Sequence, residues 1–345
     1  MPGGRKAVPV IRMTRPFSSR SLFIPAVSVL LVALAAASLV TGRGNPSFSD
    51  PFSGLVSLLD SSGPGYAAFR ELVINVRIPR TIAAVLVGAG LAMSGAAVQG
   101  AYRNPLVSPY ILGITAGAGC AAACALLVTQ SLLLIELAAF AGGLLTALVT
   151  YGLNRYTQIL AGIAIGMFFG SLTALAKFLA DPGDRLPAIT FWLMGSFSRV
   201  SVADAVPLCA VILAGIVLLY LLRWQVNILA AGEESAESLG IRPRRARLVL
   251  LAATALVAAG SVALCGVVGW VGLVVPHACR IFCGPDNRLL IPACAVAGGA
   301  YLLAMDLLIR TVLPGEMPIG ILTALIGAPF FAFLLKTSGT GGESP

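Results

Sequence analysis

Few side chains in this sequence could perform covalent or metal chemistry. The single histidine, His277, is followed by Cys279 and Cys283 in the pattern H-x-C-x-x-x-C. This spacing lacks the four ligands of a structural zinc site, and the three residues lie in an apolar run. Neither G-x-S-x-G nor H-E-x-x-H occurs, so His277 has no recognisable nucleophile beside it. We therefore predict no catalytic residue, no metal site and no cofactor, and expect a packed, hydrogen-bonded histidine.

The three lysines exclude one route of nucleotide binding. A P-loop requires G-x-x-x-x-G-K-[ST], in which backbone amides and the lysine hold the phosphates. Lys6 and Lys177 are followed by Ala and Phe, and Lys336 follows Leu335 rather than a glycine. If this chain pumps a solute, another subunit must hydrolyse the ATP.

Ionisable residues inside apolar runs are costly and are functional candidates by default. Asp306 and Arg310 are four residues apart in such a run. Side chains at this spacing lie on one helix face, so we expect them to form a structural pair. We place Arg310 near the outer surface.

Composition indicates that the surface of this protein is itself apolar. Hydrophobic residues make up 58% of the 345 residues, charged residues only 11%, and the mean hydropathy is +0.94. Soluble domains have about a quarter of their residues charged, so the solvent that suits this surface is membrane lipid. Continuous apolar runs favour helices over the alternating strands of a barrel. We predict an all-α, polytopic membrane protein.

Ten apolar runs are candidate transmembrane helices. Basic residues gather in alternate connecting segments, which fits the positive-inside rule with both termini in the cytoplasm and does not indicate a nucleic-acid surface. The first run resembles a signal peptide, but we expect it to be retained. We predict a cytoplasmic segment 1–20, a single transmembrane domain 21–336 and a cytoplasmic tail 337–345. The predicted spans are 21–40, 81–101, 111–129, 131–151, 158–180, 203–222, 247–265, 268–283, 290–310 and 318–336.

Two further segments have informative spacing. The cytoplasmic segment 223–247 is long and of mixed charge, and we expect a short helix there that ends at Gly240 as its cap. Such a segment could dock a soluble protein or be a solvated loop whose arginines only set topology. Gly162, Gly166 and Gly170 form a G-x-x-x-G-x-x-x-G stripe, which could pack against a neighbouring helix or line a pathway.

A series of ordered blocks then resembles one family. Residues 77–119 contain R-x-P-R, G-x-x-L-A-x-S-G-x-x-x-Q and R-N-P-L-x-x-P-x-x-L-G in succession. Later blocks are W-L-M-G-S from Trp192, V-G-L-V-V-P-H from Val271, E-M-P-I-G from Glu316 and I-G-A-P-F from Ile326. Over about 70–336 the chain resembles the permease subunits of bacterial importers for iron–siderophore complexes, haem and cobalamin. These are type II ABC importers with ten helices.

The resemblance implies partners and a location. Family members form homodimers or close heterodimers around one pathway in the bacterial inner membrane. Two cytoplasmic ABC ATPase subunits and a periplasmic substrate-binding protein complete the importer. The cargo stays open among siderophores, haem, cobalamin and oxyanions such as molybdate.

The resemblance also implies roles for particular residues. It places ATPase coupling at Gly232, Glu233, Ala236, Leu239 and Gly240, and exposed binding-protein docking at Arg77, Arg80 and Arg310. It places a cytoplasmic gate at Asn104, Leu106, Thr157 and Gln158, and the pathway lining at Gly162, Gly166 and Gly170.

Two rival functions need different features. An ion-coupled secondary transporter should show intramembrane acids that face a cavity or broken helices in repeated halves. Only Asp306, and Glu136 at the end of a span, meet the first condition. An intramembrane enzyme would have to rely on His277.

Overall fold

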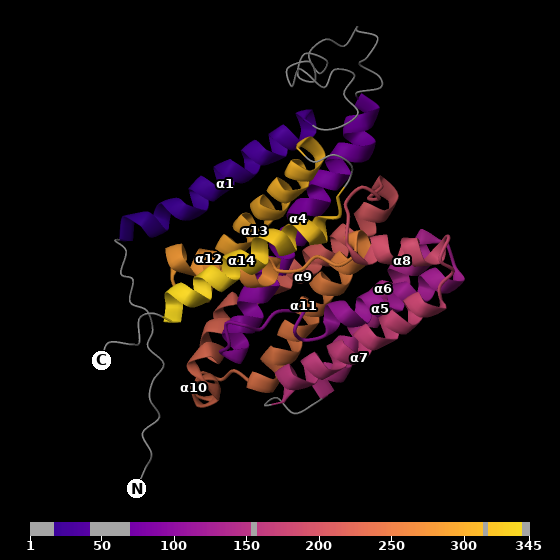
Figure 1. Ribbon diagram of the computed structural model, residues 1–345. Coiled ribbons are helices and arrows are strands. Elements are labelled where there is room, and N and C mark those ends of the chain that lie inside the picture. Colours follow the sequence, from indigo (N-terminus) through magenta and orange to yellow (C-terminus); the bar gives the residue numbers. More distant parts are fainter. Residues whose placement is uncertain (1–16, 42–69, 153–156, 313–316, 340–345) are drawn as a thin grey trace.

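The computed structural model describes residues 17–41, 70–152, 157–312 and 317–339, and every regular element in these ranges is helical (Figure 1). In chain order the elements are α1 (Phe17–Val40), the π-helical turn η1 (Val73–Arg77), α4 (Ile78–Tyr102), α5 (Ile114–Val128), α6 (Leu132–Gly152), α7 (Gln158–Leu179), α8 (Arg185–Leu193), α9 (Val202–Ala231), α10 (Glu233–Ser238), α11 (Pro243–Cys265), α12 (Val271–Cys283), α13 (Asn287–Thr311) and α14 (Ile319–Gly339).

Ten of these helices correspond to the ten predicted spans. Seven are long and apolar enough to cross a membrane, and α5, α12 and α14 contain shorter apolar stretches. The all-α membrane fold is therefore confirmed. The break between the third and fourth spans is confirmed at 129–131, where α5 ends before α6 begins. The eighth span begins three residues later than predicted, because the backbone takes positive φ values at Gly266 and Trp270. The short helix α8 was not predicted.

Helix α4 lies at the centre of the bundle and packs against α9, α11, α12 and α13. It approaches α13 closely, since a Cβ added to Gly88 would lie 2.2 Å from the carbonyl oxygen of Gly298. A Cβ on Gly95 would similarly lie 1.9 Å from the Gly272 oxygen of α12. Small residues let helix backbones meet closely in lipid, where the hydrophobic effect does not drive helices together. Glycine is therefore required at these crossings.

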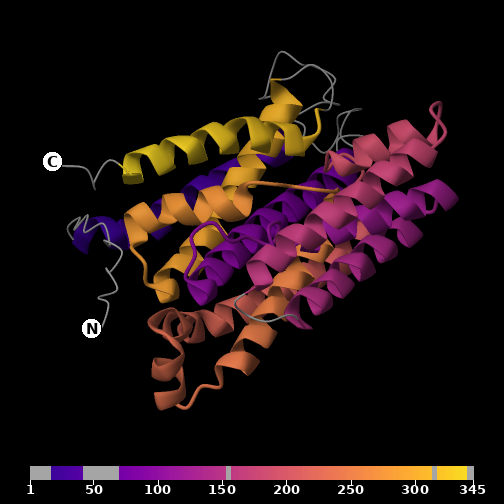
Figure 2. The same cartoon turned by 60° about the horizontal axis from the view of Figure 1, so that its bottom comes forward.

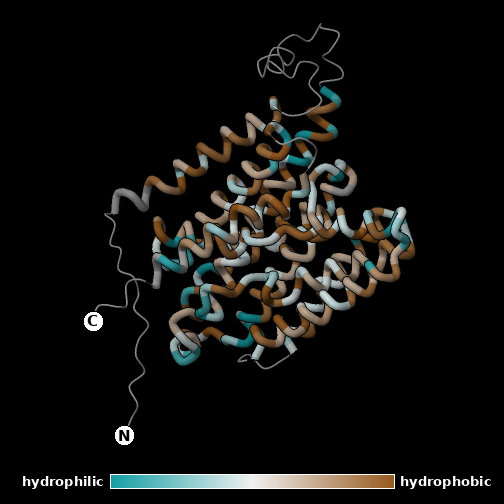
Figure 3. Tube along the Cα trace, in the orientation of Figure 1, coloured by the Kyte–Doolittle hydropathy of each residue, from teal (hydrophilic) through white to brown (hydrophobic). Residues whose placement is uncertain are grey.

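Helices α1 and α7 lie at the periphery. Few of their residues are buried within the chain, and α1 runs along one edge of the bundle beside α13 (Figure 1). Figure 3 shows apolar residues along most of α1. Such faces suit lipid or a second protein subunit.

One buried carboxylate joins two of these helices. Asp306 of α13 is 1% exposed and accepts hydrogen bonds from Arg80 of α4, with Nη2 and Nε at 2.9 and 3.0 Å from Oδ1. Arg310, one turn along α13, places its Nε 3.0 Å from Asp306 Oδ2. The predicted pair of Asp306 and Arg310 is thus confirmed. Arg80 is an additional partner that lies 226 residues away in sequence.

Arginine side chains also supply hydrogen-bond donors to the carbonyl groups at the end of α1. The last four carbonyl groups of a helix have no partner within it. Arg77 Nη1 donates to the carbonyls of Leu39 and Val40 at 2.8 and 2.9 Å, and Arg310 Nη1 donates to that of Ser38 at 3.3 Å. Positive charge at a helix C-terminus is also favoured by the helix dipole. Two arginines from distant segments therefore hold the end of a peripheral helix.

Replacing Asp306 by Asn should lower the free energy of unfolding by about 3–5 kcal/mol, the usual cost of removing one member of a buried ion pair. The loss arises because Arg80 and Arg310 would remain buried beside each other. Unfolding by SDS in mixed micelles measures this quantity. Asp184→Asn removes a carboxylate from an exposed pair with Arg185 and serves as the matched control, with an expected loss below about 1 kcal/mol. Equal losses in the two variants would contradict the structural role of Asp306.

Candidate functional site

Helix α10 projects from one end of the bundle between α9 and α11 (Figure 2). Gly240 follows it with φ of +77°. The Gly240 and Ile241 amides donate to the carbonyls of Glu237 and Ala236, both at 2.9 Å. These two bonds form a Schellman motif, which favours glycine at its left-handed position. The predicted short helix with Gly240 as its cap is confirmed.

The coupling candidates of α10 divide into a buried and an exposed set. Ala236 is fully buried against the bundle, whereas Leu239 is 64% exposed. Glu233 forms an ion pair with Arg247 of α11, which fixes the start of α10. Gly232 before it has φ of +122°, a region that L side chains rarely adopt. The helix is thus held on one side and presents an apolar side chain on the other.

The end of α9 that leads into α10 is joined to the turn before α13. Asn227 donates to Asp286 Oδ1 at 2.5 Å and accepts from the Asn287 amide at 2.7 Å. Hydrogen bonds from the Arg288 side chain, with a smaller contribution from Asn227, lower the pKa of Asp286 to about 2. The carboxylate therefore stays ionised and keeps this link at neutral pH.

The predicted gate segment after α4 is a compact turn. Arg103 ends the helix with φ of +51°, and the Asn104 amide donates to the carbonyl of Gln99 at 3.1 Å. Asn104 Oδ1 accepts from the Leu106 amide at 2.9 Å, a side-chain turn that asparagine favours. Leu106 projects from this turn and is exposed.

A tyrosine connects this turn to the second gate segment. The hydroxyl of Tyr102 donates to Gln158 Oε1 at 2.8 Å, and Gln158 Nε2 donates to the Tyr151 carbonyl at 3.2 Å. Gln158 is buried, while Thr157 is exposed at the start of α7. Tyr102 was not predicted as a site residue, although its position next to R-N-P-L was a signal. The structure brings the two gate segments together, and their gating role stays a prediction.

The three docking candidates lie inside the protein. Arg77, Arg80 and Arg310 are 2%, 5% and 6% exposed. The expectation that they are exposed is therefore wrong, because their guanidinium groups bind Asp306 and the end of α1. Direct pairing with a docked protein would require these groups to leave those partners. Docking itself stays a prediction.

The glycine stripe of α7 divides into two parts. A Cβ on Gly162 would lie 2.7 Å from the Ile111 carbonyl oxygen, so this glycine allows the chain before α5 to pack closely. Among the residues that the structure describes, Gly166 has only distant neighbours and Gly170 has none within 4 Å. Within this part of the chain, Gly162 alone of the three therefore has the packing role, and pathway lining by the stripe stays a prediction.

The histidine and cysteines of α12 are packed in the bundle. His277 Nδ1 lies 3.0 Å from the Leu273 carbonyl oxygen, and its ring meets Phe331 of α14 edge to face. Cys279 and Cys283 are buried. Within the described residues, no group of three His, Cys, Asp or Glu side chains could hold a metal ion.

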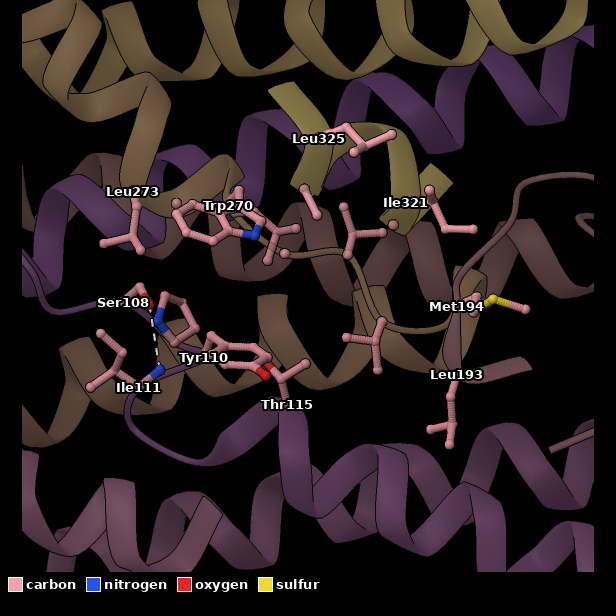
Figure 4. Close-up of a pocket in the computed structure, with 18 residues that line it drawn as sticks. Ser108, Tyr110, Ile111, Thr115, Leu193, Met194, Trp270, Leu273, Ile321 and Leu325 are labelled. Atoms are coloured by element: carbon pink, nitrogen blue, oxygen red, sulfur yellow. Dashed lines mark hydrogen bonds between the residues drawn. The ribbon is translucent and has the colours of Figure 1, made fainter. Parts of the chain in front are cut away.

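A cavity of about 730 Å³ lies where several helices begin or end (Figure 4). The chain before α5, the end of α8, the start of α12 and the start of α14 surround it. Its described lining residues are Leu91, Ser108, Pro109, Tyr110, Ile111, Thr115, Leu193, Met194, Val267, Val268, Gly269, Trp270, Gly272, Leu273, Gly320, Ile321, Ala324 and Leu325. Sequence reasoning missed this cavity, and its lining does not include the glycine stripe.

These features define a class of protein. Ten apolar helices, a short helix presented at one end and a cavity between broken helices are the parts of a multi-pass membrane permease. The chain belongs to the FecCD transport family, whose family model matches residues 30–337. It is a permease subunit of an ABC importer, and therefore a transport protein rather than an enzyme.

Relatives cover nearly the whole chain. The cobalamin import system permease BtuC of Halobacterium salinarum is 34% identical, with 93% of this chain and 89% of that protein aligned. The hemin transport system permease HmuU of Yersinia pestis is 36% identical over 89% of this chain and 93% of its own length. The molybdate import system permease MolB of Haemophilus influenzae is 34% identical, covering 92% and 96% of the two chains.

A solved structure has the same fold. An inward-facing metal-chelate type ABC transporter superposes with a TM-score of 0.82 at 32% sequence identity. The superposition covers 92% of this chain and 99% of the other.

Replacing Asn104 by Ala should loosen the gate turn, because the Leu106 amide would lose its acceptor. Amide hydrogen exchange at Leu106 should then accelerate by about fivefold, as expected for a hydrogen bond of net worth ~1 kcal/mol. Asn104→Asp keeps an acceptor oxygen in place and should exchange at the wild-type rate. Unchanged exchange in the alanine variant would show that the side chain does not hold this turn.

Proposed function

We propose that this chain imports an iron–siderophore, haem or cobalamin-type metal chelate across the bacterial inner membrane, using ATP that a partner subunit hydrolyses. The names of the relatives support a chelate cargo, since cobalamin and hemin permeases align over most of the chain. The FecCD family match and the metal-chelate transporter structure point the same way.

The geometry of α10 is the observation that carries the proposal. A docking element must resist the force that it transmits while presenting a contact surface. The Glu233–Arg247 pair, the buried Ala236 and the Gly240 cap hold the helix, and Leu239 is exposed beside the cap. We assign this surface to the ATPase, with one ATPase on each of two permease subunits.

The proposed importer contains a binding protein and a second permease subunit. A periplasmic binding protein delivers the chelate to the outer end, where α13 ends and α4 begins. Two copies of this chain, or this chain and a close relative, enclose one pathway.

The positions of the chain ends bear on the orientation in the membrane. An even number of crossings puts both termini on one side. In Figure 1 the start of α1 and the end of α14 both lie toward the end of the bundle that carries α10. This arrangement supports cytoplasmic termini.

Leu239→Ala and Gly240→Val should uncouple ATP hydrolysis from transport. The first removes the exposed apolar contact, and the second places a β-branched residue at φ of +77°. Transported substrate per ATP hydrolysed should fall by roughly 5–150-fold, the range for a coupling free energy of ~1–3 kcal/mol. Proteoliposomes that contain the permease, its ATPase and its binding protein provide the measurement.

Ser238→Ala is the matched control, because Ser238 lies on α10 and its hydroxyl donates to the Glu234 carbonyl of the same helix. It should keep normal coupling. Wild-type stoichiometry in the Leu239 and Gly240 variants would remove the assignment of α10 to the ATPase.

A further inference from the structure

One face of α9 is apolar along most of the helix and is left uncovered by the described residues. Its large side chains are 44–66% exposed, and their spacing places them in one stripe along the helix. The stripe consists of Val206, Leu213, Val217, Tyr220, Leu221 and Trp224.

The length of this stripe matches the thickness of a bilayer. Eighteen residues separate Val206 from Trp224, or about 27 Å at a rise of ~1.5 Å per residue, and the hydrocarbon core is about 30 Å thick. Helix–helix contacts in a membrane favour small residues, whereas this stripe is made of bulky ones. It therefore faces lipid tails, and Trp224 lies at the boundary with the headgroups, where tryptophan and tyrosine are enriched.

Two arginines from different helices lie over the aromatic rings at this boundary. The Cζ atom of Arg223 is 3.9 Å from the centroid of the Tyr220 ring. Arg288, at the start of α13, has its Cζ atom 5.2 Å from the centroid of the Trp224 ring. A guanidinium group is attracted to the face of an aromatic ring, so these contacts hold both cations beside the end of the stripe.

The charges at this boundary do not cancel. Asp286 Oδ2 accepts from Nη2 and Nε of Arg288 at 3.0 and 3.2 Å, which offsets one of the two positive charges. No carboxylate in the described part of the chain forms an ion pair with Arg223, whose Nη1 donates to the Tyr220 carbonyl at 2.8 Å. The surface therefore has a net charge of about +1.

Both arginines also keep hydrogen-bond donors. Among the described residues, no acceptor is bound to Nη2 of Arg223 or to Nη1 of Arg288. The Arg288 side chain is 55% exposed, so an outside group can reach it. A phosphodiester has one negative charge and two free oxygens, and charge-assisted hydrogen bonds from guanidinium groups suit it.

We propose that this surface is a binding site for one anionic phospholipid, with its phosphate between Arg223 and Arg288 and its acyl chains along the stripe of α9. A free phosphate would leave the stripe uncovered, and a soluble protein could not follow it into the bilayer. The bound phosphate joins α9 to α13 beside the hydrogen bond between Asn227 and Asp286, close to the point where α9 leads into α10. The site does not depend on which cargo the permease carries.

Quenching of tryptophan fluorescence by brominated lipids tests this proposal on the full chain in bilayers. The probes are phosphatidylglycerol and phosphatidylcholine brominated on their acyl chains, each mixed with the unbrominated form of the other. The signal of Trp224 is the difference between wild type and Trp224→Phe. Phosphatidylglycerol should be preferred at Trp224 by about fivefold, as expected for one net positive charge at the membrane surface.

Variants of the two arginines identify the source of the preference. Arg223→Gln and Arg288→Gln each remove the net charge and should lower the preference to about one. Arg223→Lys keeps the charge and should retain most of the preference. Arg70→Gln removes an exposed arginine from the start of the α4 helix, at the opposite end of the bundle (Figure 1), and is the matched control with an expected preference equal to that of wild type.

The other results contradict the site. Equal quenching of wild type by the two lipids would show that the boundary does not select an anionic headgroup. No quenching of Trp224 by either lipid would show that protein, rather than lipid, covers this face. A wild-type preference in both glutamine variants, or a loss in Arg70→Gln equal to theirs, would show that Arg223 and Arg288 do not form a local site.

Discussion

The absence of water in the bilayer is the constraint on which this structure depends, because every backbone N–H and C=O group must find a partner within the protein. Long helices such as α4 and α11 meet it by their own hydrogen bonds. The breaks at α8, α12 and α14 meet it by bonding to one another, through the Ser196, Ile319 and Gly320 amides. The permease can therefore interrupt its helices near mid-membrane, and the interruptions leave room for a cavity.

Charged residues follow the same rule. Arg77 and Arg310 are buried because the carbonyls at the end of α1 need donors, and Asp306 is buried because two guanidinium groups surround it. Glycines at the crossings of α4 with α12 and α13 bring these helices close. Small residues and a few ion pairs thus replace the hydrophobic effect as the source of tertiary structure.

Sequence reasoning located what depends on local pattern. Apolar runs placed all ten spans, the glycine after a short charged segment placed the Gly240 cap, and four-residue spacing paired Asp306 with Arg310. Sequence reasoning failed where a side chain binds a residue that is distant in sequence. Arg80 and Arg77 look like exposed anchors beside a span, and only the tertiary fold shows them bound to α13 and α1. The cavity was missed because its wall combines segments from five parts of the chain, and α8 because nine residues are too few to form a span.

The hydrogen bonds from Arg77 and Arg310 to the end of α1 have a consequence for how the protein is made. Arg310 bonds to Ser38 across 272 residues of sequence, so the first helix leaves the ribosome long before its partner exists. Until α13 has entered the membrane, the contacts among the described residues that can hold the end of α1 are those of Arg77 and of Thr81 in α4. The position of the first helix is therefore completed by nearly the last one, which couples correct insertion of the start of the chain to synthesis of almost all of it.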